Sequence, residues 1–179
     1  MVNIQVSPAP AYKKWITLLD GRQALLRPIT WSDKNAILSF FDRLSTDTKF
    51  LRFHYAKSKI APEELDRYCN VDYYNSFGIV AEMDKNSRTE IVGVGRYVRL
   101  PCSDIAEIAF VVQDSEQGNG IGTQMLKELA SLARERAVSA FVAELLNENI
   151  IMLDILRKYD PHLKQRVDGN SLLVTTIVS

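Results

Sequence analysis

Three glycines lie within five residues of one another, at positions 118, 120 and 122. The apolar segment 105–112 before them predicts a strand, and the apolar spacing over 120–136 predicts an amphipathic helix. A glycine-rich turn at a helix N-terminus leaves backbone N–H groups uncovered, and the helix dipole favours a phosphate there. We therefore expect an anion-binding loop made of Gln117, Gly118, Asn119, Gly120, Ile121, Gly122 and Thr123.

Two common nucleotide-binding loops do not fit this segment. A P-loop ends in Gly-Lys-Ser/Thr, and no string of that kind with the required spacing occurs in the chain. The dinucleotide fingerprint requires Gly-x-Gly-x-x-Gly in an early βαβ unit, whereas these glycines alternate with single residues and come late. NAD binding is therefore disfavoured, and a mononucleotide-binding protein remains one alternative.

The segment 117–122 also matches the pattern Gln/Arg-x-x-Gly-x-Gly/Ala. This pattern resembles the coenzyme A pyrophosphate loop of the GNAT superfamily of N-acetyltransferases. The order of the surrounding elements is similar too, with a strand before the loop and then helix, strand, helix and two strands. The resemblance implies acetyl-CoA as a co-substrate and no metal.

Further segments extend the resemblance over residues 25–159. Together they look like the catalytic domain of bacterial protein lysine acetyltransferases of the Pat type. This resemblance implies direct transfer of an acetyl group from acetyl-CoA to a primary amine, with a protein lysine as the leading acceptor. The segments that carry it are Leu26–Ile29, Phe40–Ser45, Leu51–Phe53, Asn70–Tyr73, Ile91–Tyr97 and Ala106–Val112.

Glu107 is the carboxylate within the apolar segment 105–112, and the resemblance implies that it is the general base. An alkylammonium has a pKa of about 10.4, so the base must remove a proton, and we expect it to act through a water. Burial among apolar neighbours would raise the pKa of Glu107 and suit it to this task. The alternative is a carboxylate that faces solvent or pairs with Arg96 or Arg99.

The resemblance assigns further contacts to the coenzyme. The backbone of Phe110, Val111 and Val112 would pair with the pantetheine arm, while their side chains pack in the core. The residues of the glycine-rich loop would face the pyrophosphate. Asn149 would either contact the coenzyme or cap the helix that follows it.

One position departs from the pattern of the family. Many relatives carry a tyrosine on the last helix, placed to protonate the departing thiolate, and the corresponding residue here is Leu156. Tyr159 lies one turn out of register, and we expect it to pack. The general acid is therefore unassigned, and a thiol pKa of about 8.5 allows the thiolate to leave unaided.

The remaining segments predict how a fold would position this loop. Asp20-Gly21 between apolar runs predicts a hairpin with a type I′ turn, and Ser32 is expected to cap a helix. Residues 45–59 are expected to be irregular, and residues 61–69 to form a short helix. Strands are also expected over 77–82, 90–99 and 139–146. A helix is expected over 147–159, and a final hairpin over 163–178. This order predicts an α/β or α+β fold with one mixed, mostly antiparallel, GNAT-like sheet flanked by helices.

Composition limits the functional class. The chain has 179 residues, which predicts one domain over 1–179 with a loose N-terminal arm over 1–14. Lys plus Arg and Asp plus Glu both number 22, and this balance argues against nucleic-acid binding. No membrane span or signal peptide is evident, and Cys69 and Cys102 lack metal-ligand spacing. We expect a cytoplasmic monomer or homodimer without nucleic-acid, membrane or metal partners.

The leading hypothesis is therefore an acetyl-CoA-dependent N-acetyltransferase that uses Glu107 as its base. A small-amine or polyamine acetyltransferase is the alternative within the same class of enzyme. A non-catalytic acyl-CoA-binding sensor module on the same fold is the alternative in a different class, because a fold does not determine a function.

Overall fold

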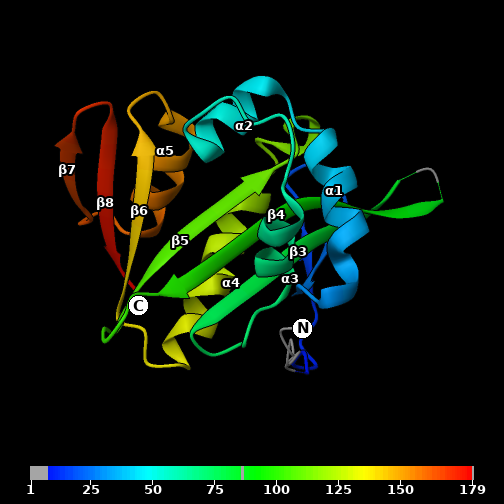
Figure 1. Ribbon diagram of the computed structural model, residues 1–179, viewed down its shortest axis with the longest axis horizontal. Helices are drawn as coiled ribbons and strands as arrows, with labels where there is room; N and C mark the ends of the chain where they lie inside the picture. The colour runs from blue at the N-terminus through cyan, green and yellow to red at the C-terminus, as the bar shows by residue number, and fades with distance from the viewer. Residues whose placement is uncertain (1–7, 86, 179) are drawn as a thin grey trace.

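The computed structural model describes residues 8–85 and 87–178 as one eight-stranded sheet with helices on both faces (Figure 1). The strand order is β1-β2-β3-β4-β5-β6-β8-β7. The strands are β1 (Lys14–Thr17), β2 (Gln23–Pro28), β3 (Ser76–Lys85), β4 (Arg88–Arg99), β5 (Ile105–Val112), β6 (Ala140–Leu146), β7 (Lys164–Asp168) and β8 (Ser171–Ile177). The α-helices are α1 (Lys34–Asp42), α2 (Thr46–Phe53), α3 (Pro62–Cys69), α4 (Ile121–Arg134) and α5 (Ile150–Tyr159).

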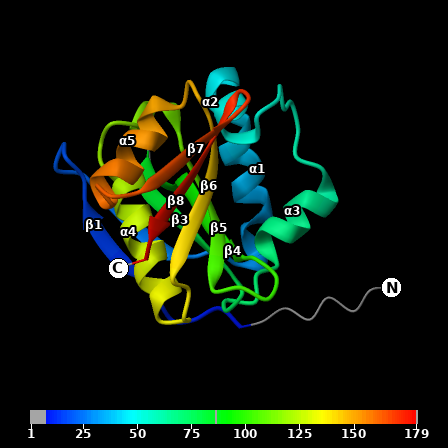
Figure 2. The same cartoon turned by 90° about the vertical axis from the view of Figure 1, so that its left-hand side faces the viewer.

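The helices form two layers around the sheet. Helices α1, α2 and α3 cover one face, and α4 and α5 cover the other (Figure 2). A row of aromatic rings fixes the sheet beneath α4, with ring centroids 6.2 Å apart for Phe77 and Tyr97 and 5.9 Å apart for Tyr97 and Phe141. All three rings are fully buried, so the centre of the sheet is a rigid platform.

The pairing of β5 with β6 differs from every other pairing in the sheet. It is parallel, whereas the others are antiparallel, and it joins only three residue pairs: Ile105 with Ala140, Ala106 with Phe141, and Glu107 with Val142. Beyond Glu107 the two strands diverge, while β5 stays paired with β4 and β6 with β8. One edge of residues 108–112 therefore has no strand partner.

The expected fold class is confirmed, with local corrections. The type I′ turn at Asp20-Gly21 is wrong, because only Gly21 has a positive φ, of +85°. The Gly21 N–H donates to the carbonyl of Leu18, and the Leu18 N–H donates to the carbonyl of Arg22, which closes a longer turn. The cap expected from Ser32 is provided instead by Thr30 and Asp33, which form a capping box.

Two further corrections concern the N-terminal half of the chain. The expected irregular segment 45–59 contains helix α2. The expected loose arm ends before Lys14, because Lys14 starts β1 and forms an ion pair with Glu128 of α4. Residues 1–7 of that arm lie outside the described residues. In the described part of the chain, no helix is both long and apolar enough to cross a membrane.

The close contact of Gly78 with Ile29 yields a prediction about stability. A Cβ atom at position 78 would overlap Cγ2 of Ile29, whose side chain is fully buried. We expect Gly78→Ala to lower the free energy of unfolding by about 1–3 kcal/mol through overpacking, measured by urea denaturation. Combining it with Ile29→Leu, which removes that branch, should recover part of the loss, and strict additivity would contradict this assignment.

Candidate functional site

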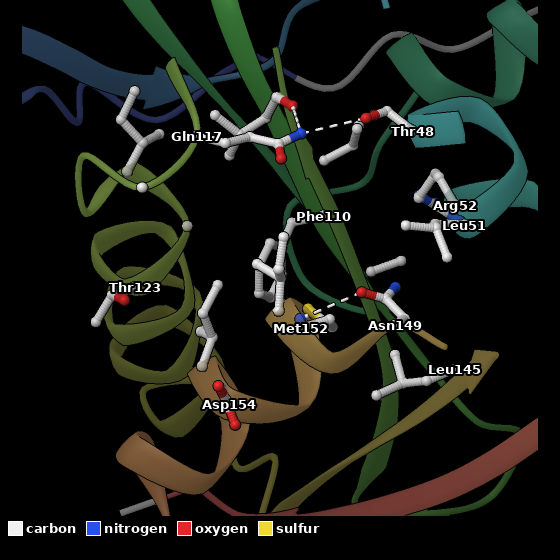
Figure 3. Close-up of a pocket in the computed structure, with 18 of the residues that line it drawn as sticks. Thr48, Leu51, Arg52, Phe110, Gln117, Thr123, Leu145, Asn149, Met152 and Asp154 are labelled. Carbon is white, nitrogen blue, oxygen red and sulfur yellow. Dashed lines mark hydrogen bonds between the residues drawn. The ribbon is translucent and has the colours of Figure 1, made fainter. Parts of the chain in front are cut away.

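The divergence of β5 and β6 opens a cavity of about 350 Å³. Its walls come from β5, β6, the loop before α4, and helices α2, α4 and α5 (Figure 3). Most of the sequence-predicted site residues line it: Phe110, Val111, Val112, Gln117, Gly118, Gly120, Ile121, Gly122, Thr123 and Asn149. Asn119 and Glu107 do not line the cavity.

The three glycines of the loop serve two different purposes. Gly118 and Gly120 have positive φ angles of +78° and +88°, which side chains with a Cβ rarely adopt. Gly122 is required for packing, because an added Cβ would lie 3.1 Å from Cδ1 of Ile155 and 3.3 Å from Cε2 of Phe110. Gly118 and Gly120 therefore shape the turn, and Gly122 allows α4 to pack against Phe110 and Ile155.

The N-terminus of α4 presents its backbone donors at the cavity. Gly120 is the N-cap of the helix. The first N–H of α4 that donates to a backbone carbonyl is that of Gln124, and its acceptor is the carbonyl of Gly120. Within the described residues, the N–H groups of Ile121, Gly122 and Thr123 have no protein acceptor. Ile121 is itself buried, so its contribution is its backbone. Three free donors at the positive end of a helix form a site for an anion.

A buried carboxylate holds this loop in place. Glu116 accepts a hydrogen bond from Arg22 at 2.7 Å and forms a 2.6 Å ion pair with Lys85, so it joins the loop to two hairpins of the sheet. Desolvation acts to raise the pKa of Glu116, but the two cations outweigh it and hold the pKa below its usual value. Glu116 is therefore ionised in the folded protein at neutral pH.

Helix α2, which sequence reasoning missed, forms the second wall of the cavity. The Gln117 side chain donates to the Val112 carbonyl at 3.0 Å and to Oγ1 of Thr48 at 3.2 Å (Figure 3). Its amide therefore positions the loop, whereas the resemblance implied a contact with the pyrophosphate. The carboxylate of Asp114 accepts hydrogen bonds from Ser45 and Thr48. These contacts bring Leu51 and Arg52 of α2 to the cavity.

Glu107 lies where β5 and β6 begin to diverge, and we call the gap between the two strands beyond this point the split. It belongs to the last of the three residue pairs that join β5 to β6, directly before the edge of β5 becomes unpaired. Its side chain is exposed, so the expectation of a buried carboxylate is wrong. It lies on the face of the sheet opposite to that of Ile108 and Phe110, and within the described residues it forms no ion pair with Arg96 or Arg99.

Helix α5 closes the cavity from the remaining side. The Asn149 side chain caps this helix by accepting a hydrogen bond from the Met152 N–H at 3.2 Å (Figure 3). The capping role expected for Asn149 is confirmed. Leu156, where the resemblance placed the tyrosine of many relatives, is fully buried and carries no proton to donate. Among the described residues there is no group of His, Cys, Asp or Glu side chains that could hold a metal ion.

Comparison with known proteins identifies this arrangement. Residues 23–160 match the family model described as an acetyltransferase (GNAT) domain. The chain belongs to the GNAT acetyltransferase family. The matched span runs from β2 to the end of α5 and so contains every element that lines the cavity except the tip of the first hairpin.

Relatives within the GNAT family include proteins of the Pat type. An acetyltransferase of Pseudomonas aeruginosa is 31% identical over 121 residues, or 67% of this chain and 65% of that protein. The acetyltransferase Pat of Mycolicibacterium smegmatis is 28% identical over 152 residues, or 84% of this chain and 43% of that protein. The chain therefore matches less than two thirds of the length of either relative.

Solved structures of GNAT proteins agree with the fold. The GNAT domain of S. lividans PAT superposes with a TM-score of 0.85 at 28% identity, covering 95% of this chain and 99% of that one. A Salmonella typhimurium protein solved with its cofactor acetyl-CoA has a TM-score of 0.66 at 14% identity, covering 87% and 94%. At that identity the likeness shows the fold alone.

The ion pairs of Glu116 generate a prediction. Glu116→Gln should lower the free energy of unfolding at pH 7 by about 1–3 kcal/mol, because it removes a charged acceptor from two cations. Since folding depresses this pKa, the stabilisation is present above about pH 4.3 and disappears as pH falls through the folded-state pKa. Urea denaturation across this range should show the gap between wild type and variant closing in acid.

A matched control separates this effect from a general loss of charge. Glu135→Gln removes an exposed carboxylate whose ion pair with Arg136 spans 3.4 Å, and it should change stability little at any pH. A gap for Glu116→Gln that stays constant down to acid pH would contradict the role of the charge.

Proposed function

We propose that this chain is an acetyl-CoA-dependent N-acetyltransferase that transfers an acetyl group directly to a primary amine. The observation that carries the proposal is the split between β5 and β6 with the free N–H groups of α4 at its mouth. Family membership supports it, since GNAT proteins use acetyl-CoA.

The residues around the split fit coenzyme A. The N–H groups of Ile121, Gly122 and Thr123 would hold the pyrophosphate, because they are free and lie at the positive end of α4. The unpaired edge of β5, at Phe110, Val111 and Val112, would pair with the amides of the pantetheine arm as a strand would. Gly118 and Asn119 would shape the loop, and the amide nitrogen of Asn149 would face the coenzyme across the cavity.

The chemistry requires a base near the apex of the split. Acetyl-CoA supplies an activated thioester when bound. Glu107 stands at the last paired position of β5, and its exposed carboxylate would accept the proton of the amine through a water. No tyrosine occupies the position of Leu156, so the thiolate would leave without a proton from that helix.

We infer a protein lysine as the acceptor. Pat-type relatives support this choice, and so does the exposure of Glu107, because a carboxylate open to solvent is accessible to a side chain carried by a large molecule. A base for a small amine would more commonly lie inside a closed pocket lined by polar groups.

Ligand binding provides the first test of the proposal. Acetyl-CoA and CoA at about a hundredfold excess over their Kd should raise the Tm by about 5–10 °C, as follows from the linkage of binding to folding. ATP and NAD at the same concentrations should not. Differential scanning fluorimetry makes the comparison, and a shift with ATP or NAD but not with CoA would overturn the coenzyme assignment.

Replacing Glu107 separates an enzyme from a non-catalytic sensor. Glu107→Gln should lower kcat for acetylation of a lysine peptide by about 10²- to 10⁴-fold, the usual contribution of a general base. The acetyl-CoA Tm shift should remain, because Glu107 lies outside the cavity. Glu63→Gln, an exposed carboxylate on α3, is the matched control and should keep full activity. Full activity of Glu107→Gln would remove it from the mechanism.

A further inference from the structure

A second, smaller cavity of about 30 Å³ lies on the other face of the sheet. It is enclosed by α1, α2, α3 and the neighbouring strands β4 and β5, and its walls are mostly apolar. It shares Arg52, Ala109 and Val111 with the larger cavity, so the two spaces adjoin through the edge of β5. The charged side chains in its wall are Arg52 and Arg96.

These two arginines differ from the other partly buried arginines of the chain. Arg27 is paired with Asp33 and Glu82, and Arg136 donates to the carbonyls of Tyr73 and Leu132. Neither Arg52 nor Arg96 forms a hydrogen bond or an ion pair through its side chain with any described residue.

The contacts that these guanidinium groups do make leave their N–H groups free. Arg96 lies over the ring of Tyr68 at 5.1 Å, and Arg52 lies over the ring of Phe53 at 5.2 Å. Burial above all lowers the pKa of Arg96, and the like charges of Arg52 and Arg67 act in the same direction, while Tyr68 and Glu107 act to raise it. Partial burial of two cations that form no ion pair with a described carboxylate is costly, and an anion between them would relieve that cost.

The cavity has a defined relation to Glu107. Arg96 is paired with Ala109, and Glu107 stands two residues from Ala109 on the same face of the sheet. Such diagonal neighbours have Cβ atoms about 7–8 Å apart. In an extended chain this distance corresponds to about two residues. A peptide bound beside Glu107 would therefore present one side chain to Glu107 and a nearby one to Arg96.

We propose that Arg52 and Arg96 bind a carboxylate of the amine acceptor, so that the acceptor lysine lies within a few residues of an aspartate or glutamate. This inference rests on the proposed function and adds a substrate preference to it. The pyrophosphate of the coenzyme is a less suitable occupant, because Arg96 lines only the smaller cavity and the free donors of α4 are on the opposite face.

The test compares pairs of peptides that share one lysine. One member of each pair carries a single glutamate within about two residues of the lysine, and the other carries glutamine at that position. Wild-type protein should favour the best glutamate peptide in kcat/KM by about tenfold or more, the size expected for a charge-assisted hydrogen bond. Arg96→Gln should abolish this preference.

Two further variants make the result specific. Arg134→Gln removes an exposed arginine of α4 that lines neither cavity, and it should keep the preference for glutamate. Arg96→Glu should reverse the preference, favouring a peptide with a second lysine in place of the glutamate. An acetyl-CoA Tm shift like that of wild type shows that each variant is folded.

The outcomes separate this inference from the function on which it rests. Equal kcat/KM for the glutamate and glutamine peptides in wild-type protein would overturn the carboxylate site while leaving lysine acetylation intact. Acetylation of neither peptide by a protein that binds acetyl-CoA would overturn the lysine acceptor, and this inference with it. A glutamate preference that persists in both Arg96→Gln and an Arg52→Gln variant would place the carboxylate elsewhere.

Discussion

The structure depends on one interruption of hydrogen bonding, the divergence of β5 and β6 after three residue pairs. A sheet ordinarily satisfies the donors and acceptors of every central strand, so a central strand with one open edge requires another partner. The other edge of β5 is fixed by β4, which pairs with it over seven positions, from Gly93 with Val112 to Arg99 with Ala106. The rigid side of the split thus carries the open edge, and the glycine-rich loop follows at the end of the same strand.

The loop in turn takes its shape from residues remote in the chain. Glu116 is held by Arg22 and Lys85 from two hairpins, while Asp114 is bonded to Ser45 at the start of α2. The positive φ angles of Gly118 and Gly120 are therefore imposed from both sides. Anion-binding geometry built in this way exists before any ligand arrives, which reduces the entropy lost on binding.

Much of the fold could be predicted from local sequence patterns, and the elements that could not be predicted have physical reasons for it. Strand β5 and helix α4 were predictable because their apolar periodicity is strong and the glycines separate them. Helix α2 was not, because it has no buried residue and is held by polar contacts with Asp114 and Gln117. The one sequence signal for α2 was Ser45, a residue type that favours the N-cap position, where its side chain accepts a hydrogen bond from the Thr48 N–H.

The glycine-rich loop of the candidate site could be predicted from the sequence, but the surroundings of Glu107 could not. A motif identifies the residue types at 117–122, but not that the Gln117 side chain would bind the Val112 carbonyl. The exposure of Glu107 depends on how α1, α2 and α3 pack over its face of the sheet, and these helices lie far away in the sequence. The cavity shared by Arg52 and Arg96 joins residues from two elements and has no sequence signature.

The short seam between β5 and β6 also has a mechanical meaning. Within the sheet of the described residues, only three residue pairs between β5 and β6 connect β6, β8 and β7 to the other five strands. Helices α4 and α5 pack together on one face of the sheet. Such a seam can act as a hinge, and a molecule lodged in the split would brace both halves. Amide protons of β6 and β8 would then exchange with solvent more slowly than in the free protein. The rigidity of this region would therefore come partly from the bound ligand.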